Sequence, residues 1–331
     1  MKIAINGFGR IGRTILRSII ENPRDGLDIL TVNSTSNIQD SLHLLQYDSI
    51  FGKLNAKISI INDKTVAIND KIINFISERK VENISWSNID MVMECTGAFT
   101  SRESAGLHLK SGAKYVMISA PAKEKNVPTI VCGVNEELLQ SSPEIFSIGS
   151  CTTNCLAPIA KILDKKYGIV SGFMTTVHSY TGDQNILDAA HKDLRRARAA
   201  ALSMVPTSTG AAKALSLVLP NLEGKLDGAA IRVPTPNVSV VDLVVNLAKN
   251  TTIDEVNNAF IDAASGEMSG VLACEEKPLV SCDFIKSPFS SIVDLAETKV
   301  VSGSCVRVLS WYDNEWGFSN RMLDLAQKLS H

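Results

Sequence analysis

The chain has 331 residues, enough for about two domains that each bury a core of their own. Its 33 Lys and Arg residues nearly balance 35 Asp and Glu residues, and the formal charge of -2 excludes a broad positive field that would hold a nucleic acid or an anionic membrane. Hydrophobic residues make up 45% and charged residues 21%, which indicates a globular protein rather than a disordered one. Any anionic ligand must therefore be bound by a local site.

The seven cysteines are an odd number, are scattered along the chain, and do not indicate a disulfide framework. The first residues run directly into a strand-like pattern without a charged leader, and no later stretch is apolar for the length of a membrane span. We expect a soluble, cytoplasmic protein. The spacing of His, Cys and acidic residues matches no metal-site pattern, so we expect no metal.

The first half of the chain alternates between strand and helix patterns. Residues 2–5 form an apolar run, and apolar positions with the helical period follow over residues 11–20. Further strands are expected at residues 29–32, 58–61, 65–68, 91–94 and 115–119, and a further helix at residues 102–111. This alternation predicts an α/β domain over residues 1–150, built on a doubly wound parallel sheet.

A glycine-rich turn lies between the first strand and the first helix. Its sequence, Gly7-Phe-Gly9-Arg-Ile-Gly12, has the spacing of a dinucleotide-binding turn. Gly7 allows the tight turn, Gly9 lets the backbone approach a pyrophosphate, and Gly12 permits close packing of the helix, whose N-terminal N–H groups face the anion. A glycine-rich turn without a ligand is the alternative, but the position between strand and helix favours a Rossmann-type domain.

The second strand ends near Ser34, where an NAD site usually carries an acid that binds the adenosine ribose. Ser34 lacks the negative charge that would repel a 2′-phosphate, and its hydroxyl could donate a hydrogen bond to one. The position therefore permits NADP, although no Arg or Lys lies in residues 35–41. The alternative is that Ser34 is only a turn residue and that NAD binds through other contacts.

The second half of the chain has longer strand patterns. Strands are expected at residues 169–177, 228–233, 238–248 and 306–312, and helices at residues 209–218 and 252–264. This mixture predicts an α+β catalytic domain over residues 151–314. An amphipathic helix is expected at residues 319–329. We expect the segment 315–331 to complete the first domain.

Cys151 is the candidate nucleophile. It follows Ser150 and precedes an apolar helical pattern, and at a helix N-terminus the dipole and the free N–H groups favour a thiolate. Cysteine is more often a small core residue than a reactive one, but the hydroxyl-rich surroundings of Cys151 favour the reactive interpretation. The remaining cysteines are expected to be structural. Pro158 either starts the regular part of the helix or kinks it.

His178 is the candidate base among five histidines. His331 is terminal, and His43 and His108 lie in helical stretches and are expected to be surface or packing residues, which leaves His178 and His191. His178 ends a strand and begins a loop, where an imidazole can face a cleft. A cysteine with a nearby histidine is an activated nucleophile, although sequence spacing cannot show that the two touch.

Several runs of residues resemble the phosphorylating (type I) glyceraldehyde-3-phosphate dehydrogenases, in the family's order and over essentially the whole chain. They are residues 6–13, 150–158, 178–183, 193–198, 232–237 and 311–316. The run around Cys151 is the most specific. The resemblance implies the reaction of glycolysis and gluconeogenesis in which glyceraldehyde 3-phosphate, inorganic phosphate and NAD(P) give 1,3-bisphosphoglycerate through a thioester on Cys151, with His178 as the base.

The resemblance also implies the binding residues. Thr181 and Arg232 would hold the substrate's phosphate, and Ser150, Arg196, Thr209 and Gly210 the attacking phosphate. Thr152 is expected among the substrate-binding residues as well. The residues expected to bind the cofactor are Gly7, Gly9, Arg10, Ile11, Gly12, Ser34, Arg79, Ser119 and Asn314. Asn314 would bind the nicotinamide carboxamide, and the backbone N–H of Cys151 would stabilise the oxyanion.

The chain departs from the family's NAD-specific pattern at two places. Ser34 stands where those members carry Asp, and Ala189-Ala190 stands where they carry Leu-Pro. Both departures remove charge or open space around the 2′ position, so we expect use of both NAD and NADP. Ala190 lacks the serine hydroxyl that NADP-using members offer there. The family resemblance further implies a homotetramer, assembled through about residues 180–204.

Three alternative functions remain open at this point. An erythrose-4-phosphate dehydrogenase shares much of the same framework. A Cys–His hydrolase could be built from Cys151 and His178 but would have no use for the glycine-rich turn. A catalytically silent binding protein would not need the full set of candidate residues.

Overall fold

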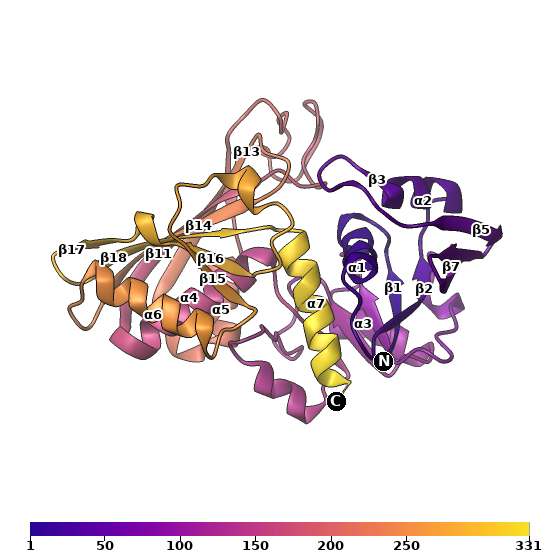
Figure 1. The fold of residues 1–331 in the computed structure, drawn as a ribbon, viewed down its shortest axis with the longest axis horizontal. Helices are drawn as coiled ribbons and strands as arrows, with labels where there is room; N and C mark the ends of the chain where they lie inside the picture. Colours follow the sequence, from indigo (N-terminus) through magenta and orange to yellow (C-terminus); the bar gives the residue numbers. More distant parts are fainter. Residues whose placement is uncertain (331) are drawn as a thin grey trace. The chain divides into compact units, whose positions relative to one another are not determined.

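A computed structural model (Figure 1) describes residues 1–330, and the chain forms two units. The first unit contains Met1–Cys132, Glu136–Gly149 and the residues from Ser319 onward. The second contains Gly133–Asn135 and Ser150–Phe318. We expected divisions after residues 150 and 314. Ser150 lies in the second unit because its side chain caps the helix that follows it.

The first unit is built on an eight-stranded sheet with the strand order β10-β9-β8-β1-β2-β7-β6-β5. Its strands are β1 (Lys2–Asn6), β2 (Asp28–Asn33), β5 (Ile58–Asn62), β6 (Thr65–Ile68), β7 (Lys71–Ile76), β8 (Met91–Glu94), β9 (Tyr115–Ile118) and β10 (Ile145–Ser147). The strands from β10 to β7 pair in parallel, which confirms the Rossmann-type sheet. The pairs β7–β6 and β6–β5 are antiparallel and extend one edge.

This unit also contains helices. They are α1 (Arg10–Glu21), α2 (Ile38–Gln46), α3 (Arg102–Lys110) and, from Ser319 onward, most of α7 (Trp316–Leu329). The short pair β3 (Tyr47–Asp48) and β4 (Gly52–Lys53) follows α2, and the 3-10 turns are η1 (Val81–Asn83) and η2 (Glu136–Ser141). Two residues of α7 are bonded to Arg24, which lies just after α1. Arg24 donates to Asn320 over 2.9 Å and pairs with Asp324. The last segment of the chain therefore completes the first unit.

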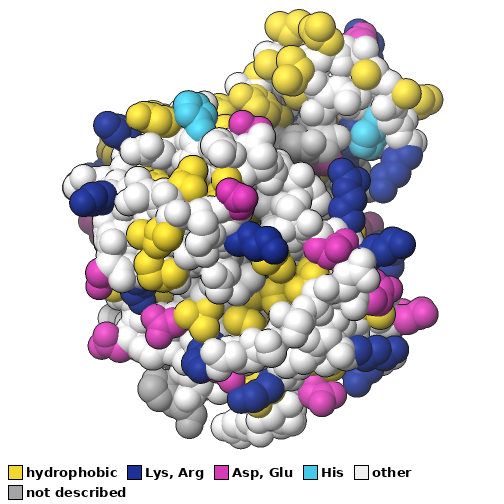
Figure 2. Space-filling model, turned by 90° about the vertical axis from the view of Figure 1, so that its right-hand side faces the viewer, with side chains coloured by type: hydrophobic (Ala, Val, Ile, Leu, Met, Phe, Trp, Pro, Cys, Tyr) yellow, Lys and Arg dark blue, Asp and Glu magenta, His cyan; other side chains and the backbone are white. Residues whose placement is uncertain are grey.

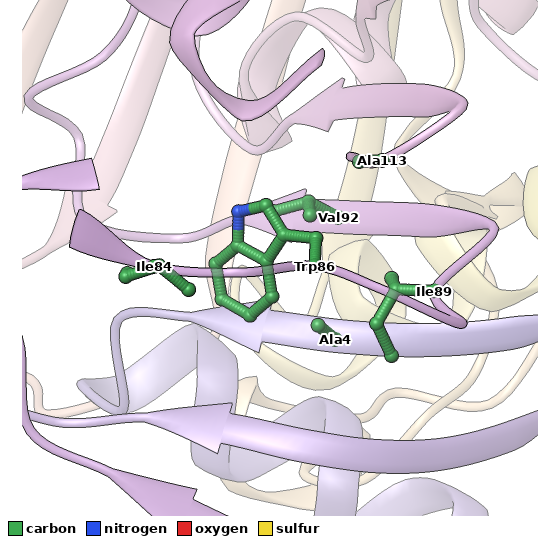
Figure 3. Close-up of a cluster of buried hydrophobic side chains, with 6 residues drawn as sticks. All are labelled: Ala4, Ile84, Trp86, Ile89, Val92 and Ala113. Carbon is green, nitrogen blue, oxygen red and sulfur yellow. The ribbon is translucent and has the colours of Figure 1, made fainter. Parts of the chain in front are cut away.

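The indole of Trp86 fills one part of the core under the sheet (Figure 3). Figure 3 shows the ring lying between apolar side chains of strands and loops, and all of them are 7% exposed or less. The members of this cluster are Ala4, Ile84, Trp86, Ile89, Val92 and Ala113. Trp86 is fully buried, and its Nε1–H donates to Nδ1 of His108 over 3.0 Å.

A buried chain of hydrogen bonds continues from His108 to the carboxyl ends of the central strands. Nε2 of His108 contacts Oε2 of Glu94 at 3.0 Å, and Asn6 donates to the same oxygen over 2.5 Å. Asn33 donates to Asn6 over 2.7 Å, and the backbone N–H of Thr96 donates to Oε1 of Glu94 over 2.7 Å. A buried polar group without a partner costs folding free energy. These hydrogen bonds therefore fix the ends of β1, β2 and β8 relative to one another.

The second unit contains a mixed sheet with the order β12-β13-β11-β14-β18-β16-β15, and β17 pairs with β18. Its strands are β11 (Ile169–Ser179), β12 (Val205–Ser208), β13 (Leu226–Val233), β14 (Ser239–Leu247), β15 (Leu272–Glu275), β16 (Ser291–Asp294), β17 (Lys299–Val301) and β18 (Cys305–Tyr312). Its helices are α4 (Cys151–Tyr167), α5 (Ala211–Val218) and α6 (Ile253–Ser265), with 3-10 turns η3 (Pro220–Leu222), η4 (Ser281–Phe284) and η5 (Leu295–Glu297).

Helix α4 is the central helix of the second unit. It contacts β11, β14, β16 and β18 as well as α5 and α6, and Figure 1 shows the three helices along one face of the sheet. The helix begins at Cys151 and continues through Pro158, so this proline does not start it. Leu156, Ile159 and Leu163 are fully buried and anchor α4 to the sheet. The first residue of α4 is thereby held in a fixed place.

Charges are mixed on the surface. Figure 2 shows one face of the molecule, on which Lys and Arg side chains alternate with Asp and Glu side chains, in keeping with the formal charge of -2. No helix within residues 1–330 is both long enough and apolar enough to cross a membrane.

Candidate active site

Cys151 occupies the first position of α4. The preceding residue, Ser150, is the N-cap, and its hydroxyl oxygen accepts a hydrogen bond from the backbone N–H of Thr153 over 3.0 Å. The first N–H groups of a helix have no intrahelical acceptor, and the helix dipole is positive at this end. The local structure thus presents a thiol and free backbone donors together.

His178 lies beside this thiol. Its Nε2 is 3.5 Å from Sγ of Cys151, although 27 residues separate the two in the chain. His178 is one residue from the end of β11 and only 4% exposed. The structure therefore brings together the two residues that sequence spacing could not join.

The hydrogen bonds of the imidazole assign its tautomer. Nδ1 lies 2.7 Å from the backbone oxygen of Ser179, which can only accept, so we place the proton on Nδ1. Nη1 of Arg232 lies 3.2 Å from Nδ1, but it also donates to the same backbone oxygen over 3.0 Å and to Thr181 over 2.9 Å. The guanidinium thus has other acceptors. Nε2 is left with a free lone pair that faces Cys151.

The charge states of the pair differ from the expected thiolate. Burial of the Cys151 thiol raises its pKa, and this effect outweighs the positive charge of Arg232 and the N–H group of Thr152, which lower the pKa. Burial, together with the charge of Arg232, lowers the pKa of His178 to about 3. At neutral pH the resting pair is therefore a thiol beside a neutral imidazole, and His178 can accept the thiol proton.

Two arginines and an acid lie close to this pair. Arg196 donates to Asp183 through Nη1 over 2.7 Å and to the hydroxyl of Thr207 through Nε over 3.0 Å. Asp183 also accepts from Thr181, the hydroxyl that Arg232 reaches. Although burial raises the pKa of Asp183, its bond to Thr181 and the charges of Arg232 and Arg196 lower it overall. Arg196 therefore pairs with this carboxylate directly, and Arg232 is linked to it through the Thr181 hydroxyl.

The structure places the other expected substrate residues at helix starts. Gly210 is the N-cap of α5, and the hydroxyl of Thr209 accepts from the backbone N–H of Ala211 over 3.2 Å. No acidic residue lies in the first turn of α5. The Thr152 hydroxyl is buried 2.9 Å from the hydroxyl of Tyr312, so it already has a partner.

The glycine-rich turn of the first unit has the shape that a dinucleotide requires. Gly7 has a φ of +97°, and a Cβ there would lie 2.7 Å from the Thr96 side chain. A Cβ on Gly12 would lie 2.2 Å from the backbone oxygen of Gly7. Gly9 differs, because its φ of -76° suits any residue and a Cβ would have no atom within 4 Å. Nothing within residues 1–330 requires glycine at position 9, which fits a backbone that must approach a bound group.

Gly9 is also the N-cap of α1, and neither a side-chain cap nor an acidic residue of the first turn occupies this helix end. The end is thus suited to a pyrophosphate.

Arg10, the first residue of α1, pairs with Asp48, and Ile11 follows it in the same turn. Arg79 is exposed on the loop after β7, and the backbone N–H of Ser119 donates to the oxygen of Glu94 over 3.0 Å.

A hollow of about 640 Å³ lies beside Ser34 in the first unit. Ser36, Lys64 and Ser77 line it together with Ser34. Lys64 belongs to the turn between β5 and β6 and reaches this hollow from a distant part of the sequence. The Ser34 hydroxyl lies 3.1 Å from that of Ser41 and accepts from the backbone N–H of Ser36. Another segment therefore supplies a cation that is absent from residues 35–41, and Asp63 and Glu78 line the same hollow.

Two family models match the chain. The model of the glyceraldehyde 3-phosphate dehydrogenase NAD binding domain matches residues 1–102, and the model of the C-terminal domain of the same enzyme matches residues 150–314. The chain belongs to the phosphorylating glyceraldehyde-3-phosphate dehydrogenase family.

Relatives of the glyceraldehyde-3-phosphate dehydrogenase family match over nearly the full length. Glyceraldehyde-3-phosphate dehydrogenase of Geobacillus stearothermophilus is 54% identical over 98% of this chain and 97% of that protein. The chloroplastic glyceraldehyde-3-phosphate dehydrogenase A of Zea mays is also 54% identical, over 98% of this chain and 81% of that protein. The glyceraldehyde-3-phosphate dehydrogenase of Cereibacter sphaeroides is 52% identical, over 98% of this chain and 97% of that protein.

Sequence reasoning missed several residues of this glyceraldehyde-3-phosphate dehydrogenase site. Asp183 was only part of a motif, although an acid in the same loop as a candidate phosphate-binding arginine, Arg196, is a signal of pairing. Lys64 could not be found, because nothing in the sequence places the β5–β6 turn beside Ser34. Two serines that contact Asn314 were also missed, namely Ser179 and Ser239.

Proposed function

We propose that this chain is a phosphorylating glyceraldehyde-3-phosphate dehydrogenase, which converts glyceraldehyde 3-phosphate and inorganic phosphate to 1,3-bisphosphoglycerate with NAD or NADP. The observation that carries the proposal is the 3.5 Å approach of Cys151 Sγ to His178 Nε2, with Arg232 and Thr181 bonded beside it. A nucleophile with an oriented base and paired phosphate donors suits a phosphorylated aldehyde.

In the first step His178 takes the thiol proton onto Nε2 while Sγ of Cys151 bonds to the aldehyde carbon. The neutral imidazole can accept this proton, and Nδ1–H remains bonded to the Ser179 oxygen. The backbone N–H of Cys151, free at the start of α4, would donate to the developing oxyanion. The charge of Arg232 stabilises the thiolate character of the sulfur during attack.

A bound NAD or NADP would supply the acceptor for the hydride that the adduct on Cys151 must lose to become a thioester. Phosphate then attacks the thioester carbonyl, and the C–S bond breaks to release the acyl phosphate, while the proton on Nε2 of His178 returns to the sulfur. A thioester suits this step because it keeps the acyl group activated. Cys151 thus serves as nucleophile and as leaving group.

We propose that the substrate phosphate is held by Thr181 and Arg232, and the attacking phosphate by Ser150, Arg196, Thr209 and Gly210. Planar guanidinium groups suit phosphate because they give paired hydrogen bonds. Asp183 holds the Arg196 guanidinium and the Thr181 hydroxyl. This ion pair would keep the donors oriented before an anion arrives. Thr152 would belong to the same substrate site, with its hydroxyl already bonded to that of Tyr312.

The residues that would hold the cofactor include the glycines of the turn, the start of α1 and Ser34, with Arg79, Ser119 and Asn314. We propose that both NAD and NADP are used. Ser34 has no charge that would repel a 2′-phosphate, and Lys64 lines the adjacent hollow of about 640 Å³. Lys64 adds a cation to the case for NADP that Ser34 and Ala189-Ala190 make from the sequence, although Asp63 and Glu78 line the same hollow.

We also propose a cytoplasmic homotetramer. The segment of residues 180–204 carries large apolar side chains that are between 72% and 84% exposed in the single chain. They are Ile186, Leu187, Leu194, Leu202 and Met204. Because exposed apolar surface of this kind marks an interaction site, a second copy of the chain is the proposed occupant. Light scattering of wild type and of a Leu194→Asp, Leu202→Asp variant tests this, with Val280→Asp as the control.

The activity test combines the purified protein with glyceraldehyde 3-phosphate and each of NAD and NADP, with and without phosphate. We expect phosphate-dependent formation of reduced cofactor, lost by about a thousandfold or more in Cys151→Ala, which corresponds to roughly 4 kcal/mol. Faster turnover of erythrose 4-phosphate would reassign the substrate. Hydrolysis of an ester without any cofactor would favour a Cys–His hydrolase instead.

A further inference from the structure

Two buried serines border the side-chain amide of Asn314. Ser179 is the last residue of β11, Ser239 is the first of β14, and Asn314 follows the end of β18. These strands are neighbours, since β14 pairs with β11 on one side and with β18 on the other. The three residues therefore meet at one end of the sheet, and they are 0%, 1% and 5% exposed.

Both serine hydroxyls point to the same oxygen. Oγ of Ser179 lies 2.9 Å and Oγ of Ser239 lies 3.1 Å from Oδ1 of Asn314. Ser239 Oγ in turn accepts the backbone N–H of Ser179 over 3.1 Å. An amide oxygen has two lone pairs and only accepts, so two hydroxyl donors satisfy it completely.

This arrangement fixes which way round the amide of Asn314 lies. If the amide were turned over, its NH₂ group would meet the two hydroxyls. The hydroxyls lie 3.3 Å apart, so one could donate to the other, but within residues 1–330 the second hydroxyl hydrogen would have no acceptor. One buried donor without an acceptor would cost more than the observed orientation. The serines therefore hold Oδ1 inward and leave Nδ2 as the group that Asn314 presents.

Nδ2 of Asn314 has no acceptor within the described part of the chain, and it is not among the buried unpaired atoms. Asn314 thus offers hydrogen-bond donors and no acceptor. A donor of this kind selects a carbonyl oxygen rather than an amino group.

We propose that Ser179 and Ser239 are positioning residues that make Asn314 a donor for the carbonyl oxygen of the nicotinamide carboxamide; this rests on the proposed function. Ser179 has a second task, because its backbone oxygen accepts Nδ1–H of His178 over 2.7 Å. One residue thus orients both the base, through its main chain, and the cofactor-binding amide, through its side chain.

The test measures binding of three dinucleotides by calorimetry, without aldehyde or phosphate. The probes are NAD, the analogue in which an acetyl group replaces the carboxamide, and the analogue in which hydrogen replaces it. In Ser179→Ala, Ser239→Ala, the amide of Asn314 loses both donors and its fixed orientation. We expect affinity for NAD and for the acetyl analogue to fall about tenfold, the value of one hydrogen bond, and affinity for the hydrogen analogue to change less than about twofold.

Matched variants separate this role from general damage. Ser291→Ala removes another fully buried serine hydroxyl, which lies 2.7 Å from that of Ser310, and should leave all three affinities unchanged. Ser239→Thr keeps a hydroxyl and should restore most of the affinity lost in Ser239→Ala. If the double variant does not fold, the two single alanine variants are compared in the same way.

Three results would overturn the proposal: equal loss for all three probes, unchanged affinity for NAD, or loss for NAD with unchanged affinity for the acetyl analogue. The last would mean that the amino group is recognised. A wild-type protein that binds none of the probes would instead contradict the proposed function.

Discussion

Nη1 of Arg232 lies 3.2 Å from Nδ1 of His178, the ring nitrogen that does not face the nucleophile. Burial is the larger cause of the low pKa of the imidazole, about 3, and this permanent charge adds to it. The same charge lowers the pKa of Cys151, against the effect of burial. One guanidinium therefore keeps the base neutral and favours ionisation of the thiol.

Arg232→Met should slow modification of Cys151 by iodoacetamide. Without the guanidinium charge, the pKa of the thiol rises further, so the pH profile of alkylation should move to higher pH and the rate near pH 7 should fall about tenfold. Iodoacetamide is neutral, so loss of an anion site does not affect it. Arg198→Met, which removes an exposed arginine paired with Asp188, is the control. A profile that moves to lower pH would contradict the assigned role.

Gly9→Ala should weaken dinucleotide binding without destabilising the protein. The backbone of Gly9 suits alanine and the new Cβ would have open space, so the midpoint of thermal unfolding should be unchanged. The methyl group would keep a pyrophosphate from the start of α1, and calorimetry should show at least about tenfold weaker NAD binding.

Gly12→Ala provides the contrasting variant for the same turn. Its Cβ would lie 2.2 Å from the Gly7 oxygen, so the turn itself must shift and the protein should unfold at lower temperature. Equal effects of the two substitutions on stability would show that Gly9 serves the fold rather than a ligand.

Ser34→Asp should make the enzyme selective for NAD. The new carboxylate would repel a 2′-phosphate, and we expect kcat/KM for NADP to fall about a hundredfold, roughly 2.7 kcal/mol, with little change for NAD. Lys64→Met should act in the same direction but less strongly, because Lys64 lines the hollow beside Ser34. Steady-state kinetics of the wild type would sink the idea of dual use if kcat/KM for NAD exceeded that for NADP by more than about a hundredfold.

His108→Leu should destabilise the first unit. The substitution removes the partner of the Trp86 indole N–H and one partner of Glu94, and all three side chains are buried. Two buried polar groups that lose a partner cost about 3 kcal/mol together. Urea unfolding followed by tryptophan fluorescence measures the loss, and Trp86 is one of the three tryptophans of the chain. His43→Leu is the matched control, since His43 is exposed, and a similar effect of the two variants would count against the buried network.

Regular patterns made much of the fold predictable. The turn from Gly7 to Gly12 and the long amphipathic helix that begins at Cys151 have clear local signals. The short strands β10, β15, β16 and β17 have only three or four residues each, too few for a period to stand out. At the antiparallel edge of the first sheet, the sequence predicted the strands at residues 58–61 and 65–68 but not their pairing with β7, because that pairing depends on the tertiary structure.

A site residue was predictable where the residues next to it in the sequence form a characteristic motif, as they do at Cys151 and His178. Their 3.5 Å separation was not, since it depends on how α4 packs on the sheet. The charge state was also misjudged. A helix start favours a thiolate, but the sequence does not show how deeply the sulfur is buried, and burial raises the pKa of the thiol more strongly than Arg232 lowers it.

Helix α7 begins in the second unit and ends in the first, where Asn320 and Asp324 bond to Arg24. During synthesis the cofactor-binding unit therefore lacks one of its helices until the whole catalytic segment has been made. The same interleaving constrains recombination, because an exchange of the nucleotide-binding unit between two genes needs crossovers at both ends of the catalytic segment.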